Sequence, residues 1–196
     1  MRFKCVKCAS CCKDKNVIVT LTHLDIIRLA DFLNCDGREL LRNYLSFYQA
    51  NHQLIEKLVF PALETYRGKA ILGLRKRNDG TCVFLEGNLC SIYPARPMIC
   101  RTFPFTFSIE NGLLRYGLTI KAKKDCKGLG KGREVKKHEL ALIGEKAVRE
   151  LESYRKIVAV WNKMVKEGFP AIPDLFIEAI LKGAFSTRGE SIQVTP

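Results

Sequence analysis

The densest group of chemically reactive side chains lies near the beginning of the sequence. Four cysteines fall within eight residues: Cys5, Cys8, Cys11 and Cys12. A Cys-x2-Cys turn directs both sulfur atoms to one side of a tight loop, where backbone N–H groups can donate to them. This arrangement suits Zn²⁺, whose bonds to thiolate sulfur are about 2.3 Å long, and it also suits an iron–sulfur cluster. The spacing therefore predicts a thiolate-ligated metal centre.

Four later cysteines can complete the ligand sets, namely Cys82, Cys90, Cys100 and Cys126. Eight cysteines make two tetrahedral four-thiolate sites, or one cluster plus one mononuclear site. Because neighbouring side chains usually diverge, we expect Cys11 and Cys12 to serve different ions, unless one of them bridges two. The spacing leaves open which cysteine binds which ion.

The remaining cysteine and the histidines are expected to do other things. Cys35 stands apart within a helical pattern, where a free cysteine usually acts as a small hydrophobe. His23, His52 and His138 have no cysteine beside them, so we expect surface or capping roles. A disulfide scaffold is disfavoured, because the nine cysteines are odd in number and no apolar signal segment follows Met1.

Charge is the second unusual property of the chain. The sequence has 33 Lys and Arg residues against 20 Asp and Glu residues, which gives a net charge of +13. Four thiolates around one divalent ion carry a net charge of about −2, and buried negative charge needs compensation. Arg96 and Arg101 flank Cys100 in an apolar segment, so we expect them to stabilise the metal centre or the fold around it.

A basic stretch also raises the alternative of nucleic-acid binding. Residues 121–139 hold eight basic side chains: Lys121, Lys123, Lys124, Lys127, Lys131, Arg133, Lys136 and Lys137. Such a stretch can contact phosphates. No aromatic stacking array or known nucleic-acid motif accompanies it, so this alternative is not favoured. An acidic protein, steered by the same basic face, is the other partner that the charge suggests.

Apolar spacing predicts helices on both sides of a small antiparallel sheet. Strands are expected at residues 16–20, 70–74 and 82–85, with a hairpin of residues 103–109 and 113–120 across Asn111-Gly112. A helix is expected from Thr22, with Leu24, Ile27, Leu29 and Phe32 on its apolar face. A second is expected from Asp36, with an apolar face that includes Leu40, Leu41, Tyr44, Leu45 and Tyr48. Further helices are expected over residues 140–165 and after a cap at Asp174. The glycines of residues 128–132 predict a flexible loop, and residues 186–196 a polar tail.

These elements predict an α+β fold in a single domain, with a cysteine-rich loop, helices, a small antiparallel sheet and C-terminal helices. We expect residues 1–131 to form a cysteine-cluster metal-binding domain and residues 132–196 a helical extension packed on it. The composition, 47% hydrophobic and 27% charged, excludes a disordered or fibrous chain. No apolar run approaches the roughly 18 residues of a membrane span, so an intracellular, cytoplasmic protein without membrane contact is expected.

Three separated segments together resemble the YkgJ-type cysteine-cluster family, whose signature is CxxCxxCC. They are residues 5–12 (CVKCASCC), residues 82–105 and residues 126–132. The resemblance covers roughly residues 1–132 and implies that all eight clustered cysteines are metal ligands. Ala9 and Lys127 depart from the pattern, in which glycine and proline are common, but neither change removes a ligand.

This family is described as zinc- or iron-chelating, or as Fe–S oxidoreductase-like. The resemblance therefore implies that the protein binds zinc or iron, and the iron could be held in a [4Fe–4S] cluster. The Cys-x2-Cys-x2-Cys run resembles the opening of a bacterial ferredoxin motif, although Cys12 follows Cys11 directly. The expected roles are redox or electron transfer, or a zinc-stabilised interaction module. Similar motifs occur in flagellin-lysine N-methylases, but those chains are longer and this sequence lacks a methyl-donor glycine motif. Whether the protein is an enzyme stays open, since no general base stands out.

Overall fold

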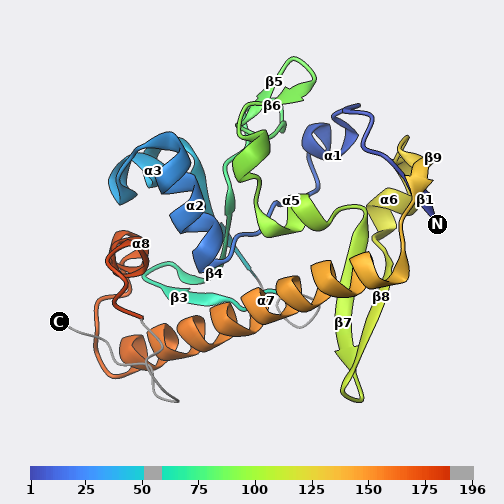
Figure 1. Cartoon of the computed structure of the whole chain (residues 1–196). Coiled ribbons are helices and arrows are strands. Elements are labelled where there is room, and N and C mark those ends of the chain that lie inside the picture. The colour runs from blue at the N-terminus through green and yellow to red at the C-terminus, as the bar shows by residue number, and fades with distance from the viewer. Residues whose placement is uncertain (51–58, 186–196) are drawn as a thin grey trace. The chain divides into compact units, whose positions relative to one another are not determined.

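Short helices, one long helix and small antiparallel sheets make up the computed structural model, which describes residues 1–50 and 59–185 (Figure 1). The helices are α1 (Ser10–Lys13), α2 (His23–Leu33), α3 (Gly37–Asn43), the 3-10 helix η1 (Tyr93–Ala95), α5 (Met98–Thr102), α6 (Ile120–Asp125), α7 (Lys137–Lys166) and α8 (Pro173–Leu181). The strands are β1 (Arg2–Phe3), β2 (Leu45–Gln49), β3 (Leu63–Thr65), β4 (Gly68–Leu74), β5 (Leu85–Glu86), β6 (Leu89–Cys90), β7 (Phe105–Glu110), β8 (Leu113–Leu118) and β9 (Leu129–Glu134). The predicted α+β fold is confirmed.

Residue contacts group the chain into two compact units, each built from two separate segments. Unit 1 comprises Met1–Val19 and Lys76–Glu150, and unit 2 comprises the described residues of Thr20–Arg75 and Leu151–Pro196. The division predicted between residues 131 and 132 stays a prediction. In the described ranges, no helix has the length and apolar character that crossing a bilayer would require.

Unit 1 contains two-stranded sheets, of which the β7–β8 hairpin is the longest. Its strands pair from Phe105 opposite Leu118 to Glu110 opposite Leu113. Asn111 and Gly112 have φ angles of 51° and 74°, the left-handed pair that a tight two-residue hairpin turn requires. The hairpin predicted across Asn111-Gly112 is therefore confirmed.

Unit 2 has a three-stranded antiparallel sheet in the order β2-β4-β3, and α2 and α3 both contact α8. The N-terminus of α2 carries the predicted capping box, in which Thr22 Oγ1 accepts from the Asp25 backbone N–H while the Asp25 carboxylate accepts from the Thr22 N–H. Trp161 is only 2% exposed, contacts the Phe176 ring edge-on at 5.2 Å, and donates from Nε1 to the Glu64 carbonyl.

Two predicted helical faces are wrong in detail. In α2, the predicted apolar face included Leu24 and Phe32, which are 37% and 46% exposed, because Ile26 and Ala30 turn inward beside Leu29 instead. The next helix begins after its predicted cap, Asp36, but ends at Asn43. The apolar residues that follow pair with β4 as strand β2, since tertiary pairing outweighs local helical spacing.

Three segment predictions are also wrong. Residues 16–20 contribute only a single bridge at Thr20. Residues 82–85 turn back, and the Val83 carbonyl accepts from the Arg77 guanidinium at 2.9 Å instead of from a neighbouring strand. Residues 129–132 belong to strand β9, whose Leu129 and Glu134 pair with Phe3 and Arg2 of β1. Gly130 and Gly132, with φ angles of 77° and 73°, lie in the irregular stretch between these two pairs. Residues 186–196 lie outside the described residues.

Candidate metal centre

The first cysteine loop is folded by two residues in the left-handed backbone region. Lys7 and Ala9 have φ angles of 52° and 57°. The Ala9 carbonyl then accepts from the N–H groups of Cys12 and Lys13, both at 2.9 Å, which starts the single turn of α1. This turn carries Cys11 and Cys12 on adjacent positions, directly after a sharp reversal of the chain.

The sulfur atoms of Cys11 and Cys12 lie side by side, with an Sγ···Sγ distance of 3.8 Å. The expectation that these neighbouring side chains diverge is wrong, because the short turn at Ala9 lets both thiols turn toward each other. Their close contact allows one proton to be shared between the two sulfur atoms. Hydrogen bonding from Cys12, opposed in part by burial and aided by Arg96, lowers the pKa of Cys11 to about 6, whereas the same hydrogen bond and burial raise the pKa of Cys12.

Cys82 is tied to this pair through the backbone. Its N–H donates to the Cys12 carbonyl at 2.9 Å, and its side chain is buried. Burial raises the pKa of the Cys82 thiol, and the neighbouring Cys90 adds to that effect. A residue seventy positions away in the sequence is thus brought to the first loop by a main-chain hydrogen bond.

Cys90 and Cys100 extend the group. Burial raises the pKa of Cys90, with a smaller electrostatic contribution from Cys11. Cys100, in α5, contributes electrostatically to the raised pKa of Cys12, as does Cys82. The structure therefore gathers five of the eight predicted ligands into one electrostatically linked group, which we call the thiol cluster: Cys11, Cys12, Cys82, Cys90 and Cys100.

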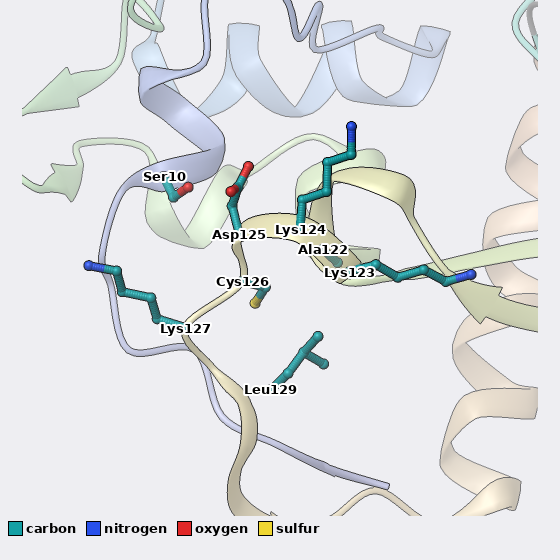
Figure 2. A pocket seen from close by; sticks show the side chains of 8 residues that line it. All are labelled: Ser10, Ala122, Lys123, Lys124, Asp125, Cys126, Lys127 and Leu129. Carbon is teal, nitrogen blue, oxygen red and sulfur yellow. The ribbon is translucent and has the colours of Figure 1, made fainter.

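The other three predicted ligands lie in the first loop and beside strand β9. Cys5 is exposed, Cys8 is half-buried, and Cys126 ends helix α6. The pairing of β1 with β9, with a hydrogen bond of 3.2 Å from the Lys4 N–H to the Gly128 carbonyl, brings the chain around Cys5 and Cys126 together. Cys126 lines an open hollow of about 480 Å³ with Ser10, the residue before Cys11 (Figure 2).

All nine cysteines are free thiols. In the part of the chain that the structure describes, no three Cys, His, Asp or Glu side chains converge closely enough to surround one ion. The donor type fits thiophilic ions such as zinc and iron. The assignment of all eight cysteines as ligands stays a prediction.

Positive charges lie against the thiol cluster. The Arg96 guanidinium stacks 3.7 Å above the centroid of the Tyr93 ring. Its charge helps to lower the pKa of Cys11 and partly offsets the rise that burial causes in the pKa of Cys90. Lys76 was missed in the sequence, although it bridges Cys82 in the backbone and its ammonium interacts with both Cys82 and Cys12. In the sequence, the only indication that Lys76 lies near the cysteines is its position in the basic run before Cys82.

Arg101 has a different partner. Its guanidinium lies 3.6 Å from the carboxylate of Glu150, a residue that is 4% exposed, so Arg101 balances a buried carboxylate in unit 1.

Phe105 of the Phe-Pro-Phe segment is buried and contacts Phe3 edge-on at 5.9 Å, as apolar packing would require.

Cys35 and the described histidines, which are not predicted ligands, are divided between the two units. Cys35 lies in unit 2, where burial raises its pKa. His23 is also in unit 2, 3.5 Å from the Ser153 hydroxyl, and its ring stacks on Tyr154. His138 is exposed in the first turn of α7, and His52 lies outside the described residues.

Two known proteins resemble this chain over about two thirds of its length. The chain is 28% identical over 129 residues to "Uncharacterized protein MJ0661" and 29% identical over 141 residues to "Uncharacterized protein MJ0939", both of Methanocaldococcus jannaschii. These matches cover 65% and 69% of this chain but only 58% and 40% of the two relatives. No solved structure matches the chain.

A family described as "CxxCxxCC: Putative zinc- or iron-chelating domain" matches residues 4–138. The match includes all eight clustered cysteines and covers well over half of the chain. The chain belongs to this CxxCxxCC family, as its cysteine spacing indicated.

Proposed function

We propose that unit 1 binds zinc or iron through the thiolates of the eight cysteines, and that the thiols of Cys11 and Cys12 share one ion. The observation that carries this proposal is the Sγ···Sγ distance of 3.8 Å between these two cysteines. Two thiolates bound to one tetrahedral zinc ion lie about 3.8 Å apart, because each Zn–S bond is about 2.3 Å long. Cys82, held to Cys12 by its N–H, is the next ligand that we assign to this ion.

This distance also favours a mononuclear ion over a [4Fe–4S] cluster. In such a cluster each iron takes one cysteine, so two ligating sulfur atoms lie farther apart than two on the same ion. A cluster would require Cys11 and Cys12 to separate. A single zinc or ferrous ion accepts the pair as it stands.

Arg96 and Lys76 supply charge compensation for this site. Four thiolates and one divalent ion leave a net charge of about −2. Both cations interact electrostatically with members of the thiol cluster. Main-chain carbonyls hold both side chains in place, because Lys76 Nζ donates to the Gly80 carbonyl and Arg96 Nε to the Tyr93 carbonyl.

The apolar core of unit 1 is poor, which gives a bound metal a stabilising role. Among the described residues, twelve large side chains are the most deeply buried, and only Ile92 of these belongs to unit 1. Small domains with weak cores commonly depend on metal ions, whose binding energy then contributes directly to folding. We therefore favour a zinc- or iron-stabilised module over a site whose metal is dispensable for the fold.

The identity of the ion decides between two roles. Zinc in closed thiolate sites would make the protein a structural or interaction module. Iron would add electron transfer, for which the exposed position of Cys11 leaves the centre open to a partner. An Fe–S oxidoreductase-like role would require the cluster that the distance between Cys11 and Cys12 disfavours.

Metal analysis after anaerobic purification separates these cases. We expect about two zinc or iron ions per chain and no acid-labile sulfide. Near-stoichiometric sulfide in a brown protein would replace the mononuclear assignment by a cluster. Mass spectrometry that finds the clustered cysteines joined pairwise by disulfides, with no metal bound, would overturn the proposal.

Replacing one cysteine tests the ligand assignment directly. Cys12→Ser and Cys8→Ser should each lower the metal content by about one ion per chain and reduce the melting temperature, since each removes a thiolate. Cys35→Ser serves as the matched control and should leave the metal content unchanged. Loss of metal in Cys35→Ser, with full metal content in the other two variants, would show that the ligands are assigned wrongly.

A further inference from the structure

The net charge of the protein is concentrated in one unit. Unit 1 holds 20 of the 33 Lys and Arg residues and 9 of the 20 Asp and Glu residues, a net charge of +11. The segments of unit 2 carry only +2. Eight ligated thiolates with two divalent ions would offset only about 4 of these charges, so unit 1 remains strongly cationic with its metal bound.

Strand pairing brings two basic segments of unit 1 together. The N-terminal strand β1 lies against β9, where Arg2 Nε donates to the Gly132 carbonyl at 2.6 Å. The backbone of Lys4 passes so close to Gly128 that a Cβ on the glycine would lie 2.4 Å from the Lys4 carbonyl oxygen. The residues before the first cysteine and those around Cys126 therefore form one surface (Figure 1).

We call the exposed cations of this surface the basic strip: Arg2, Lys4, Lys123, Lys124, Lys127 and Lys131. None of them forms an ion pair with another described residue. Their neighbours differ in this respect, because Lys121 pairs with Asp14 and Asp125 at 2.7 Å and Arg133 pairs with Glu139 at 2.7 Å. The charge of the basic strip is thus available to an external anion.

The directions of the lysine side chains indicate the shape of that anion. Lys123, Lys124 and Lys127 line the hollow beside Cys126, yet Figure 2 shows their ammonium groups pointing away from one another. A single phosphate or carboxylate could not contact all three. An extended polyanion, whose charges are spaced along a chain, can contact them separately.

We propose that the basic strip binds the phosphodiester backbone of a nucleic acid without reading its sequence. Interfaces with nucleic acid are much more positively charged than those between proteins, whereas an acidic protein partner would need apolar or aromatic anchors. Helix α6 and strand β9 offer Ile120 as the one large apolar side chain that is strongly exposed within their described residues. The proposal does not depend on which metal the cysteines hold.

Fluorescence anisotropy with a labelled 20-base-pair DNA duplex of arbitrary sequence tests this proposal. The test variant is Lys123→Gln/Lys124→Gln/Lys127→Gln/Lys131→Gln. The control variant removes four exposed cations from unit 2, as Arg38→Gln/Lys156→Gln/Lys163→Gln/Lys166→Gln. Both variants have the same net charge, so a difference between them reports the location of the charges.

We expect the test variant to bind at least about tenfold more weakly than the control at low salt. The slope of the logarithm of its binding constant against the logarithm of salt concentration should become shallower by about one unit for each lysine removed. A duplex of different sequence should bind the wild-type protein equally well. Equal weakening in both variants would overturn the proposal, because it would show a response to net charge alone.

Two further measurements keep the result interpretable. Metal content is determined in every variant, so that loss of DNA binding with intact metal is distinguished from failure of the metal centre. Polyglutamate is added as a competitor at equal charge concentration. If it displaces the duplex as well as unlabelled DNA does, an acidic protein replaces nucleic acid as the partner.

Discussion

At the scale of single residues, Ala9 controls the geometry of the first cysteine loop. Its φ of 57° places an L-residue with a Cβ in the left-handed region, where the conformation costs roughly 1 kcal/mol. Its carbonyl nevertheless accepts two N–H groups and begins the turn that brings Cys11 and Cys12 together. The loop therefore tolerates backbone strain at Ala9.

Substitutions at Ala9 should separate backbone strain from side-chain packing. Ala9→Gly should keep the full metal content and a similar melting temperature, because relief of strain offsets the larger chain entropy of glycine. Ala9→Val should lose at least about half of the metal, since a β-branched residue resists positive φ. Metal analysis and thermal unfolding of both variants give the answer, and equal metal retention by the two would contradict it.

Arg96 should tune the affinity of the site without being a ligand. Its guanidinium is held over Tyr93 and acts on Cys11 and Cys90. Arg96→Gln should weaken metal affinity by roughly 10-fold or more, the usual effect of changing a group that supports ligands. Arg115→Gln, on the exposed strand β8, is the control. Chelator competition measures both, and identical affinities would exclude this role for Arg96.

Cysteine spacing predicts which thiols are ligands, but the sequence contains less information about how these thiols meet. Cysteine spacing and family resemblance identified the eight thiols, five of which the structure links electrostatically. The approach of Cys11 to Cys12 could not be predicted, because it depends on the left-handed turn at Ala9. Lys76 was missed because its proximity to Cys82 arises from a bridge formed only in the folded chain.

At the scale of secondary-structure elements, the packing of α7 on the β7–β8 hairpin depends on one glycine. A Cβ at Gly144 would lie 2.4 Å from Cδ1 of Phe107 and 3.0 Å from a methyl carbon of Leu114. Glycine is unfavourable within a helix by about 1 kcal/mol relative to alanine. The close approach of the hairpin explains why glycine occupies this helical position.

Gly144→Ala should consequently destabilise the protein by about 1–2 kcal/mol, because crowding exceeds the gain in helix propensity. In a Phe107→Ala background, which removes the ring, the same substitution should be neutral or stabilising. Chemical denaturation of the four proteins in this cycle measures the coupling. A stabilising effect of Gly144→Ala in the wild-type background would contradict the packing described here.

Elements with strong local signals were predicted correctly. The long helix α7, the capping box at Thr22 and the hairpin at Asn111-Gly112 each carry their information in neighbouring residues. Strand β9 was predicted as a loop, because its glycines give no strand signal and only pairing with β1 orders them. Strand β2 was predicted as helix for the related reason that its partner, β4, is remote in sequence.

At the scale of the whole molecule, the predicted ligands and the single tryptophan belong to different units. All eight clustered cysteines lie in unit 1, whereas Trp161 is buried in unit 2 between aromatic rings. Tryptophan fluorescence therefore reports on unit 2 alone. The larger apolar core of unit 2 gives it a source of stability that does not require metal.

Metal removal should therefore affect the units unequally. On treatment with a strong chelator, backbone amides of β1 and β9 should lose protection from hydrogen exchange, because the weak core of unit 1 loses its metal ligation. The emission maximum of Trp161 should stay unchanged. A red shift of this emission that accompanies metal loss at the same chelator concentration would show that unit 2 depends on the metal as well.

The pairing of β1 with β9 also has a consequence for synthesis on the ribosome. Arg2 and Phe3 are translated more than a hundred residues before their partners Glu134 and Leu129. At roughly 5–20 residues per second, the amino-terminal thiols wait about ten seconds for the strand that fixes them. During that interval the nascent chain carries Cys5, Cys8, Cys11 and Cys12 as an unassembled, oxidisable segment, so a cell that makes this protein must keep the emerging polypeptide reduced until its second half has left the exit tunnel.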